Sequence, residues 1–333
     1  MKKMLDKKKS VFVSVAMGAA VLTACGGAET DGATEDAADS YPEREIEVYV
    51  GHGPGGGTDN FVRTITNEME DIIDGNFNII NQEGGSGVVA MQNAMQQNQG
   101  DGYTLIGDSA FAVTTAAGTN SYGLDQVVPI ARIQSDIYAI QVLSDEFDSI
   151  EDLVAYAEEN PGEVNLGAVG TMGIDEITAR RFINATGTDM NYIPMEGAGQ
   201  MHSGLLGGHL DAILEEVGPT VSYIESGDFQ PLVFFSEERL DDFEDVPTTV
   251  EQGWDLTDGV ERYLMAPADT PEAIIEKLED AARQAMETET YQEYAANNYL
   301  DLRDGWMGAE DFKQKLEEDI EIYEEIIAEI EGE

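Results

Sequence analysis

The residues best suited to chemistry in this chain are a run of three glycines and the polar pair that follows it. Gly55, Gly56 and Gly57 stand before Thr58 and Asp59, between a short apolar stretch and a segment with helical spacing of apolar residues. The first amides of a helix lack partners within the helix and carry a partial positive charge. Glycines let the backbone approach a ligand closely. The run therefore predicts a site for a carboxylate or phosphate, built from main-chain amides.

Two well-known phosphate-binding patterns do not fit this turn. A P-loop needs a lysine after its glycines, and none follows here. Gly51, Gly53 and Gly56 have the spacing of a dinucleotide fingerprint, but Pro54 lies inside it. An acidic residue ending a second strand about 20 residues later is also missing. A tight turn from strand to helix, with no ligand, stays open as the simpler interpretation.

Two further polar side chains belong to the same part of the chain. Residues 46–50, 77–80 and 103–107 predict strands separated by helices, which favours a parallel sheet. Ligands bind beyond the carboxyl ends of such strands. Ser109 follows the third strand and could donate its hydroxyl to a ligand, or could be an ordinary residue at a strand end. His52 could bond a ligand oxygen or serve only the structure of the turn.

A second strand, glycine turn and helix occur near the middle of the chain. The turn covers residues 167–173, and Thr171 and Asp175 are placed to point at a ligand. Asp175 equally suits an acid that stabilises the first turn of its own helix. Two such turns predict two domains, each presenting a helix N-terminus to one cleft.

The rest of the chain continues the alternation of strands and helices. Residues 127–142 have strand character throughout, and Ser149 is placed to cap the helix that follows. Residues 263–266 predict a strand that returns to the first domain. Thr270 and Pro271 predict a helix start, with Thr as the N-cap and Pro in the first helical position.

The charge balance is strongly acidic. The chain has 17 basic and 67 acidic residues, a formal net charge of −50. Such a surface repels itself at low salt, whereas at about 1 M salt the Debye length falls to roughly 3 Å. We therefore expect a protein that faces high salt outside the membrane. Nucleic acid is excluded as a partner because the sequence has no basic patch.

The N-terminus has the pattern of a bacterial lipoprotein. Residues 1–24 combine a basic start, a short apolar run and small residues before Cys25, which is typical of a signal peptide. Cys25 is the only cysteine, so we expect it to carry a lipid and to form no internal disulfide. Residues 25–40 are small and acidic, and predict a disordered tether.

The sequence argues against an enzyme, with one alternative left open. A hydrolase using Ser109 and His52 would need its serine in a G-x-S-x-G turn, and that pattern does not occur. The H-E-x-x-H zinc motif is also missing, and the three histidines are too scattered to predict a metal site. We expect no cofactor. A structural or adhesive lipoprotein would leave the two glycine turns without a use.

Eight short stretches, in order, resemble the extracytoplasmic solute-binding proteins of tripartite tricarboxylate transporters, the Bordetella uptake gene family. Among them are P-G-G-G-T-D, D-G-Y-T-L, L-L-G-G-H-L-D, D-V-P-T-T and A-P-A-D-T-P. The stretches are residues 41–46, 54–59, 101–105, 161–162, 167–170, 205–211, 245–249 and 266–271. The resemblance covers residue 41 to about the C-terminus. It implies an α/β fold of two lobes, a type II periplasmic-binding-protein fold that closes like a Venus flytrap.

The resemblance also implies a binding site and partners. In the family, the turns after the first strand of each lobe hold a ligand carboxylate through backbone amides and water. Carried over, these are residues 55–59, with Val169, Gly170 and Thr171. Glu196 stands where the family often has a cation, and His52 where it often has an aromatic residue. An acid at this position suits a monocarboxylate, an aromatic acid or an amino acid better than a tricarboxylate, unless Glu196 faces solvent.

The expected organisation follows from these observations. Residues 41–143 and 256–333 form the first lobe, and residues 144–255 form the second. We expect a monomer, anchored outside the cell membrane through Cys25, that passes a small organic carboxylate to two integral membrane subunits.

Overall fold

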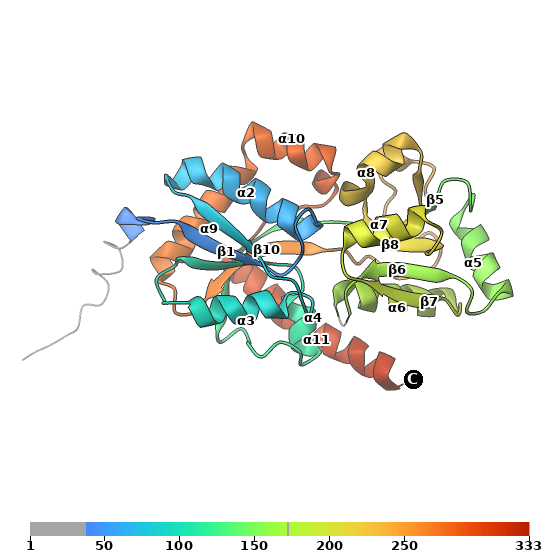
Figure 1. Ribbon diagram of the computed structural model, residues 1–333, viewed down its shortest axis with the longest axis horizontal. Helices are drawn as coiled ribbons and strands as arrows, with labels where there is room; N and C mark the ends of the chain where they lie inside the picture. Colours follow the sequence, from blue (N-terminus) through green and yellow to red (C-terminus); the bar gives the residue numbers. More distant parts are fainter. Residues whose placement is uncertain (1–37, 172, 333) are drawn as a thin grey trace, which may run out of the picture.

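Two lobes lie side by side in the computed structural model, which describes residues 38–171 and 173–332 (Figure 1). Each lobe has one sheet of mostly parallel strands with helices on both faces. The predicted two-lobed α/β fold is confirmed. Cys25 lies outside the described residues, as do the signal peptide and most of the predicted tether.

The first lobe contains a sheet of six strands in the order β11-β4-β10-β3-β1-β2. Strands β1 to β3 are parallel, and β10 runs antiparallel between β3 and β4. The carboxyl ends of β1 and β3 therefore meet at one edge of the sheet. The strands are β1 (Ile46–Val50), β2 (Phe77–Asn81), β3 (Thr104–Asp108), β4 (Val127–Ser135), β10 (Glu261–Pro267) and β11 (Met307–Gly308).

The helices of the first lobe bury apolar stripes on both faces of this sheet. Phe61, Val62, Ile65 and Met69 of α2 have the predicted helical spacing and pack on one face, together with α9. Helices α3, α4 and α11 cover the other face. The helices are α2 (Gly57–Ile73), α3 (Val88–Gln97), α4 (Phe111–Ala116), α9 (Glu272–Met286), α10 (Glu289–Asn297) and α11 (Ala309–Gly332).

The second lobe contains five strands in the order β7-β6-β8-β5-β9. Ser149 caps α5 as predicted, because its hydroxyl accepts a hydrogen bond from the Asp152 amide. The strands are β5 (Tyr138–Leu143), β6 (Asn165–Val169), β7 (Asn191–Met195), β8 (Ala212–Glu216) and β9 (Phe229–Phe234). The helices are α5 (Ile150–Glu159), α6 (Ile174–Thr186), α7 (Ala198–Leu206) and α8 (Val217–Ser226).

The two crossings between the lobes lie elsewhere than predicted. Residues 127–142 form two strands, since β4 belongs to the first sheet and β5 pairs with β8 and β9 in the second. The first crossing is therefore at Asp136 and Ile137, not after residue 143. Leu256 and Val260 pack in the core of the second lobe, so the chain returns just before β10 rather than at residue 256. The two crossings are joined by a hydrogen bond from the Asp136 amide to the Val260 carbonyl, 2.8 Å.

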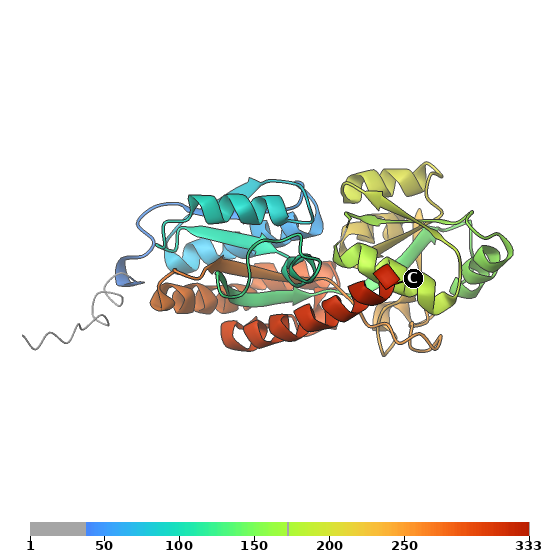
Figure 2. The ribbon, with the colours of Figure 1, turned by 90° about the horizontal axis from the view of Figure 1, so that it is seen from below.

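Helix α11 contacts both lobes. Phe312 and Leu316 are buried against the first lobe, whereas Tyr323, Ile326 and Ile327 pack against the core of the second. Figure 2 shows the helix running from one lobe to the other. The assignment of residues 256–333 to the first lobe alone is therefore wrong for the end of α11.

The start of α9 and the apolar character of the helices bear on two further predictions. The N-cap of α9 is Pro271 rather than Thr270, one residue later than predicted. No helix within residues 38–171 and 173–332 is both long and apolar enough to cross a membrane.

Candidate functional site

In the glycine turn between β1 and α2, some of the backbone amides already donate hydrogen bonds within the turn. Helix α2 begins at Gly57, with Gly56 as an N-cap that offers no side chain. The Gly55 amide donates to Asp59 Oδ2 at 2.9 Å, and the Gly56 amide donates to the Gly53 carbonyl at 3.2 Å. Within the described residues, the amides of Gly57 and Thr58 make no hydrogen bond. These two amides, rather than those of Gly55 and Gly56, are the donors available to an anion.

Asp59 stabilises the turn. Its side chain is 1% exposed and accepts hydrogen bonds from the Gly55 amide, from Arg63 at 3.0 Å and from Asn81 at 2.8 Å. Burial opposes its charge, but these donors together hold the pKa of Asp59 below its ordinary value. We therefore expect Asp59 to support the turn without touching a ligand.

The first sheet brings Ser109 beside the glycine turn. Strands β1 and β3 are neighbours, and the hydroxyls of Thr58 and Ser109 lie 3.2 Å apart. Asp108 fixes the Ser109 segment by accepting from the amides of Ser109 and Ala110 at 2.8 and 3.1 Å. Burial raises the pKa of Asp108 to about 6. The two hydroxyls therefore lie together beside the free amides of α2.

A buried arginine lies under the start of α2, and sequence reasoning missed it. The Arg262 guanidinium packs so closely on Gly57 that a Cβ there would come within 2.2 Å of Nη2. Nη2 donates to Glu216 Oε1 at 2.6 Å, and Nη1 donates to Asp136 Oδ2. Burial opposes the charge of Arg262, but these two carboxylates raise its pKa, so it stays protonated. A charged residue inside the apolar strand β10 was the signal that could have identified it.

His52 lies near Arg262, and its imidazole is neutral there. Burial and the nearby charge of Arg262 lower the pKa of His52 to about 4. Its Nδ1 is shielded from solvent and has no partner among the described residues. The imidazole therefore offers one ring nitrogen to a further polar group beside Arg262.

The glycine turn of the second lobe is likewise bonded within the protein. The Gly170 amide donates to the Met195 carbonyl at 2.8 Å, and the Tyr192 hydroxyl donates to the Gly170 carbonyl at 2.6 Å. Asp175 accepts a hydrogen bond from the Tyr138 hydroxyl. Burial and the charge of Glu216 raise the pKa of Asp175 to about 7. Gly170 and Asp175 therefore stabilise this side of the cleft.

The lobes contact each other where the turn after β2 meets the glycine turn of the second lobe. Ser86, in the turn after β2, donates its hydroxyl to the Thr171 carbonyl at 3.1 Å. A Cβ on Gly173 would lie 2.7 Å from the same hydroxyl oxygen. Gly51 packs even more closely on Gly87, where a Cβ on Gly51 would lie 2.2 Å from the Gly87 Cα, and this couples the β1 turn to the turn containing Ser86. The β1 turn therefore reaches the second lobe through the turn containing Ser86, and one cleft formed by the two predicted turns stays a prediction.

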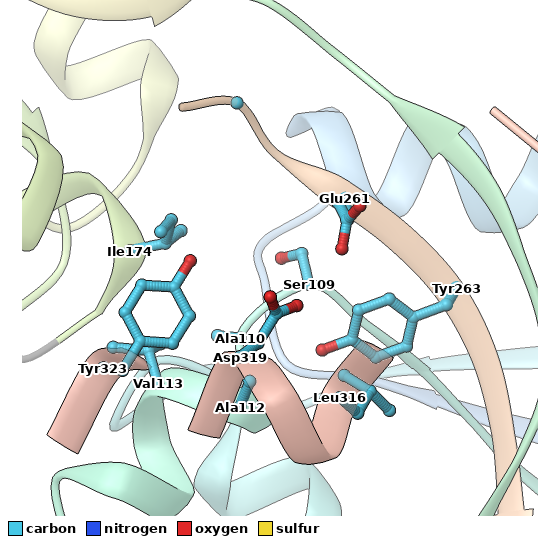
Figure 3. Close-up of a pocket in the computed structure, with 11 residues that line it drawn as sticks. Ser109, Ala110, Ala112, Val113, Ile174, Glu261, Tyr263, Leu316, Asp319 and Tyr323 are labelled. Atoms are coloured by element: carbon cyan, nitrogen blue, oxygen red, sulfur yellow. The ribbon is translucent and has the colours of Figure 1, made fainter. Parts of the chain in front are cut away.

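The cavity between the lobes beside Ser109 is small. Figure 3 shows Ser109 and Asp319 near the middle, with Glu261 and Tyr263 on one side and Ile174 and Tyr323 on the other. Its volume is about 30 Å³, which suits a water molecule. Ligand pockets are typically about 300–1,000 Å³. This cavity therefore has no room for a ligand larger than water in the arrangement of the lobes seen here.

Comparison with known proteins identifies the family. The model of the tripartite tricarboxylate transporter family receptor matches residues 61–331. The chain belongs to this receptor family. Its members are extracytoplasmic solute-binding components of membrane transporters. BugT of Bordetella pertussis is 30% identical over 267 residues, which cover 77% of this chain and 80% of BugT.

Solved structures have the same two-lobed fold. A TctC solute-binding protein from Polaromonas is 26% identical with a TM-score of 0.66, covering 87% of this receptor and 99% of that chain. MatC from Rhodopseudomonas palustris, solved with malate, is 22% identical with a TM-score of 0.77, covering 86% and 100%. A second R. palustris protein, solved with adipate, is 21% identical with a TM-score of 0.77, covering 88% and 98%.

The remaining predicted residues of this receptor lie at the ends of strands β6 and β7. Val169 ends β6, and Thr171 is exposed in the turn that follows. Glu196 is exposed after β7, where its amide donates to Gln200 Oε1 at 2.9 Å. A ligand contact by Glu196 stays a prediction, and its exposure favours the solvent-facing alternative.

Proposed function

We propose that this receptor captures a small dicarboxylate between its two glycine turns and delivers it to membrane transporter subunits. The observation that carries the proposal is the pair of free amides at Gly57 and Thr58, at the positive end of a helix of 17 residues. The hydroxyls of Thr58 and Ser109 and the nitrogen of His52 add neutral polar contacts around them.

The ligands of similar proteins support this class. Malate and adipate both have two carboxylates, and the two proteins solved with them share the fold of this receptor. One carboxylate would accept from the amides of α2. The other would lie toward the turn of the second lobe, so that the lobes close across the ligand.

We also propose an extracytoplasmic location with a lipid on Cys25 and a monomeric state. The sequence pattern before Cys25 supports the anchor, and the net charge of −50 supports a high-salt environment. The solute would then be bound at the outer membrane surface, close to the transporter subunits.

A thermal-shift experiment with a charged and a neutral variant tests the proposed anion site. Thr58→Asp places a carboxylate beside the free amides, so we expect it to stabilise the helix start and to abolish ligand binding. Thr58→Asn introduces a side chain with nearly the shape of Asp but without its charge, and this variant should keep measurable binding.

The measurement is the rise of Tm with increasing malate, succinate or adipate in about 1 M NaCl, where the Debye length is roughly 3 Å. The panel also includes citrate, aspartate and an aromatic acid. The wild type and Thr58→Asn should show a rise with at least one dicarboxylate, and Thr58→Asp none. An equal rise in all three proteins would place the anion elsewhere.

A further inference from the structure

A buried ion pair connects the two lobes at the base of the cleft. Arg262 belongs to β10 in the first lobe, and Glu216 ends β8 in the second. Their side chains are 5% and 6% exposed, and Nη2 lies 2.6 Å from Oε1. The pair therefore contributes to the contact between the lobes.

The position of this pair coincides with the anion site of α2. The guanidinium packs on Gly57, the first residue of the helix. Both the cation and the helix N-terminus attract negative charge. In this structure Arg262 holds the carboxylates of Glu216 and of Asp136 from the crossing, while the amides of Gly57 and Thr58 make no hydrogen bond within the described residues.

Three buried polar atoms around this pair have no partner within the described residues. They are Nε of Arg262, Nδ1 of His52 and Oδ1 of Asp136. Buried polar groups in proteins are almost always hydrogen-bonded. Unpaired groups in one place therefore mark a position beside Arg262 where a further polar molecule can bind.

We propose that Arg262 binds a carboxylate of the ligand, and that Glu216 takes the place of that carboxylate when no ligand is bound. The proposal rests on the proposed function. When the lobes separate, Glu216 leaves with the second lobe, while Arg262 keeps Asp136 and presents Nη2 beside the free amides of Gly57 and Thr58. A planar carboxylate fits these donors, because a guanidinium can hold both of its oxygens.

This exchange has a consequence for affinity and selectivity. A ligand must displace Glu216, so the apparent affinity equals the intrinsic affinity multiplied by the fraction of receptor in which Glu216 has left Arg262. An anion that is held weakly by the amides alone would then fail to open this contact.

Two substitutions of Glu216 test whether its carboxylate and that of a ligand compete for Arg262. Glu216→Ala removes the carboxylate, so added acetate should occupy the vacated position, raise Tm and reduce the radius of gyration in solution. Acetamide should do neither. Glu216→Gln keeps the shape without the charge, and should bind malate roughly tenfold more tightly than the wild type does.

The matched controls are Asp258→Ala and Asp258→Asn, because Asp258 pairs with Arg181 of α6 without joining the two sheets. The inference would be overturned if acetate changed the Tm and the radius of gyration of Glu216→Ala no more than those of Asp258→Ala. So would malate binding that Glu216→Gln leaves unchanged or weakens. Rescue by acetate without malate binding in any protein would support the inference and contradict the proposed function for that ligand.

Discussion

Replacing Arg262 with glutamine should lower the free energy of unfolding by about 3–5 kcal/mol, because two carboxylates lose their buried cation. Asp136 and Glu216 would remain in the junction between the lobes, and both are at least nine-tenths buried. Chemical denaturation near pH 7.5 in about 1 M NaCl measures the loss with surface charges screened.

The control for this prediction is Arg239→Gln. Arg239 pairs with Glu251 at 2.8 Å, but both side chains are more than 40% exposed, so the expected loss is much smaller than that of Arg262→Gln. The deficit of Arg262→Gln should also shrink toward pH 5, because protonation removes the unpaired charges. Equal losses in the two variants would contradict the assigned role of Arg262.

The wild-type protein should become less stable as the pH rises from about 4 to 8. Burial raises the pKa of Asp175 to about 7 from an ordinary value of 3.8, and it raises those of Asp108 and Asp136 to about 6. The folded protein therefore holds these protons more tightly than the unfolded chain. The resulting stabilisation is complete below pH 3.8 and is lost as the pH rises through 6 to 7.

Asp175→Asn tests the contribution of Asp175 to this dependence. The variant should remove about 2–4 kcal/mol of the variation in unfolding free energy, since one pKa unit corresponds to about 1.4 kcal/mol. Asp59, Glu216, His52 and His202 act in the opposite direction, because their pKa values are lowered on folding. Unfolding free energies measured at several pH values in about 1 M NaCl give the comparison. Parallel curves for the wild type and variant would show that Asp175 is ionised over the whole range.

Local patterns were sufficient to predict most of the fold. Glycine turns after apolar strands located the starts of α2 and α6, because turn chemistry is a property of short segments. The crossing at Asp136 was missed because strand character continues through residues 127–142. The change from one sheet to the other depends on which strands lie beside β4 and β5, and the local sequence does not contain that information.

The binding site was predictable in position but not in its donors. The sequence indicated the turn, yet it could not show that Asp59 and Gly53 already bond the amides of Gly55 and Gly56. Arg262 was missed because it comes from a strand more than 200 residues after Gly57, and only the sheet topology brings them together. Local pattern identifies a helix start, whereas the side chains around it come from tertiary structure.

The most direct test of the central claim is calorimetric titration of the receptor with malate and with its dimethyl ester. The receptor is first unfolded and refolded to release ligand acquired during expression, and the titration is carried out in about 1 M NaCl to screen surface charge. We predict one malate site per chain and no binding of the ester, because the amides of Gly57 and Thr58 require an anionic oxygen. Equal binding of the ester would contradict carboxylate recognition. If malate fails, succinate and adipate follow, and a refolded receptor that binds none of the three would contradict the proposed dicarboxylate function.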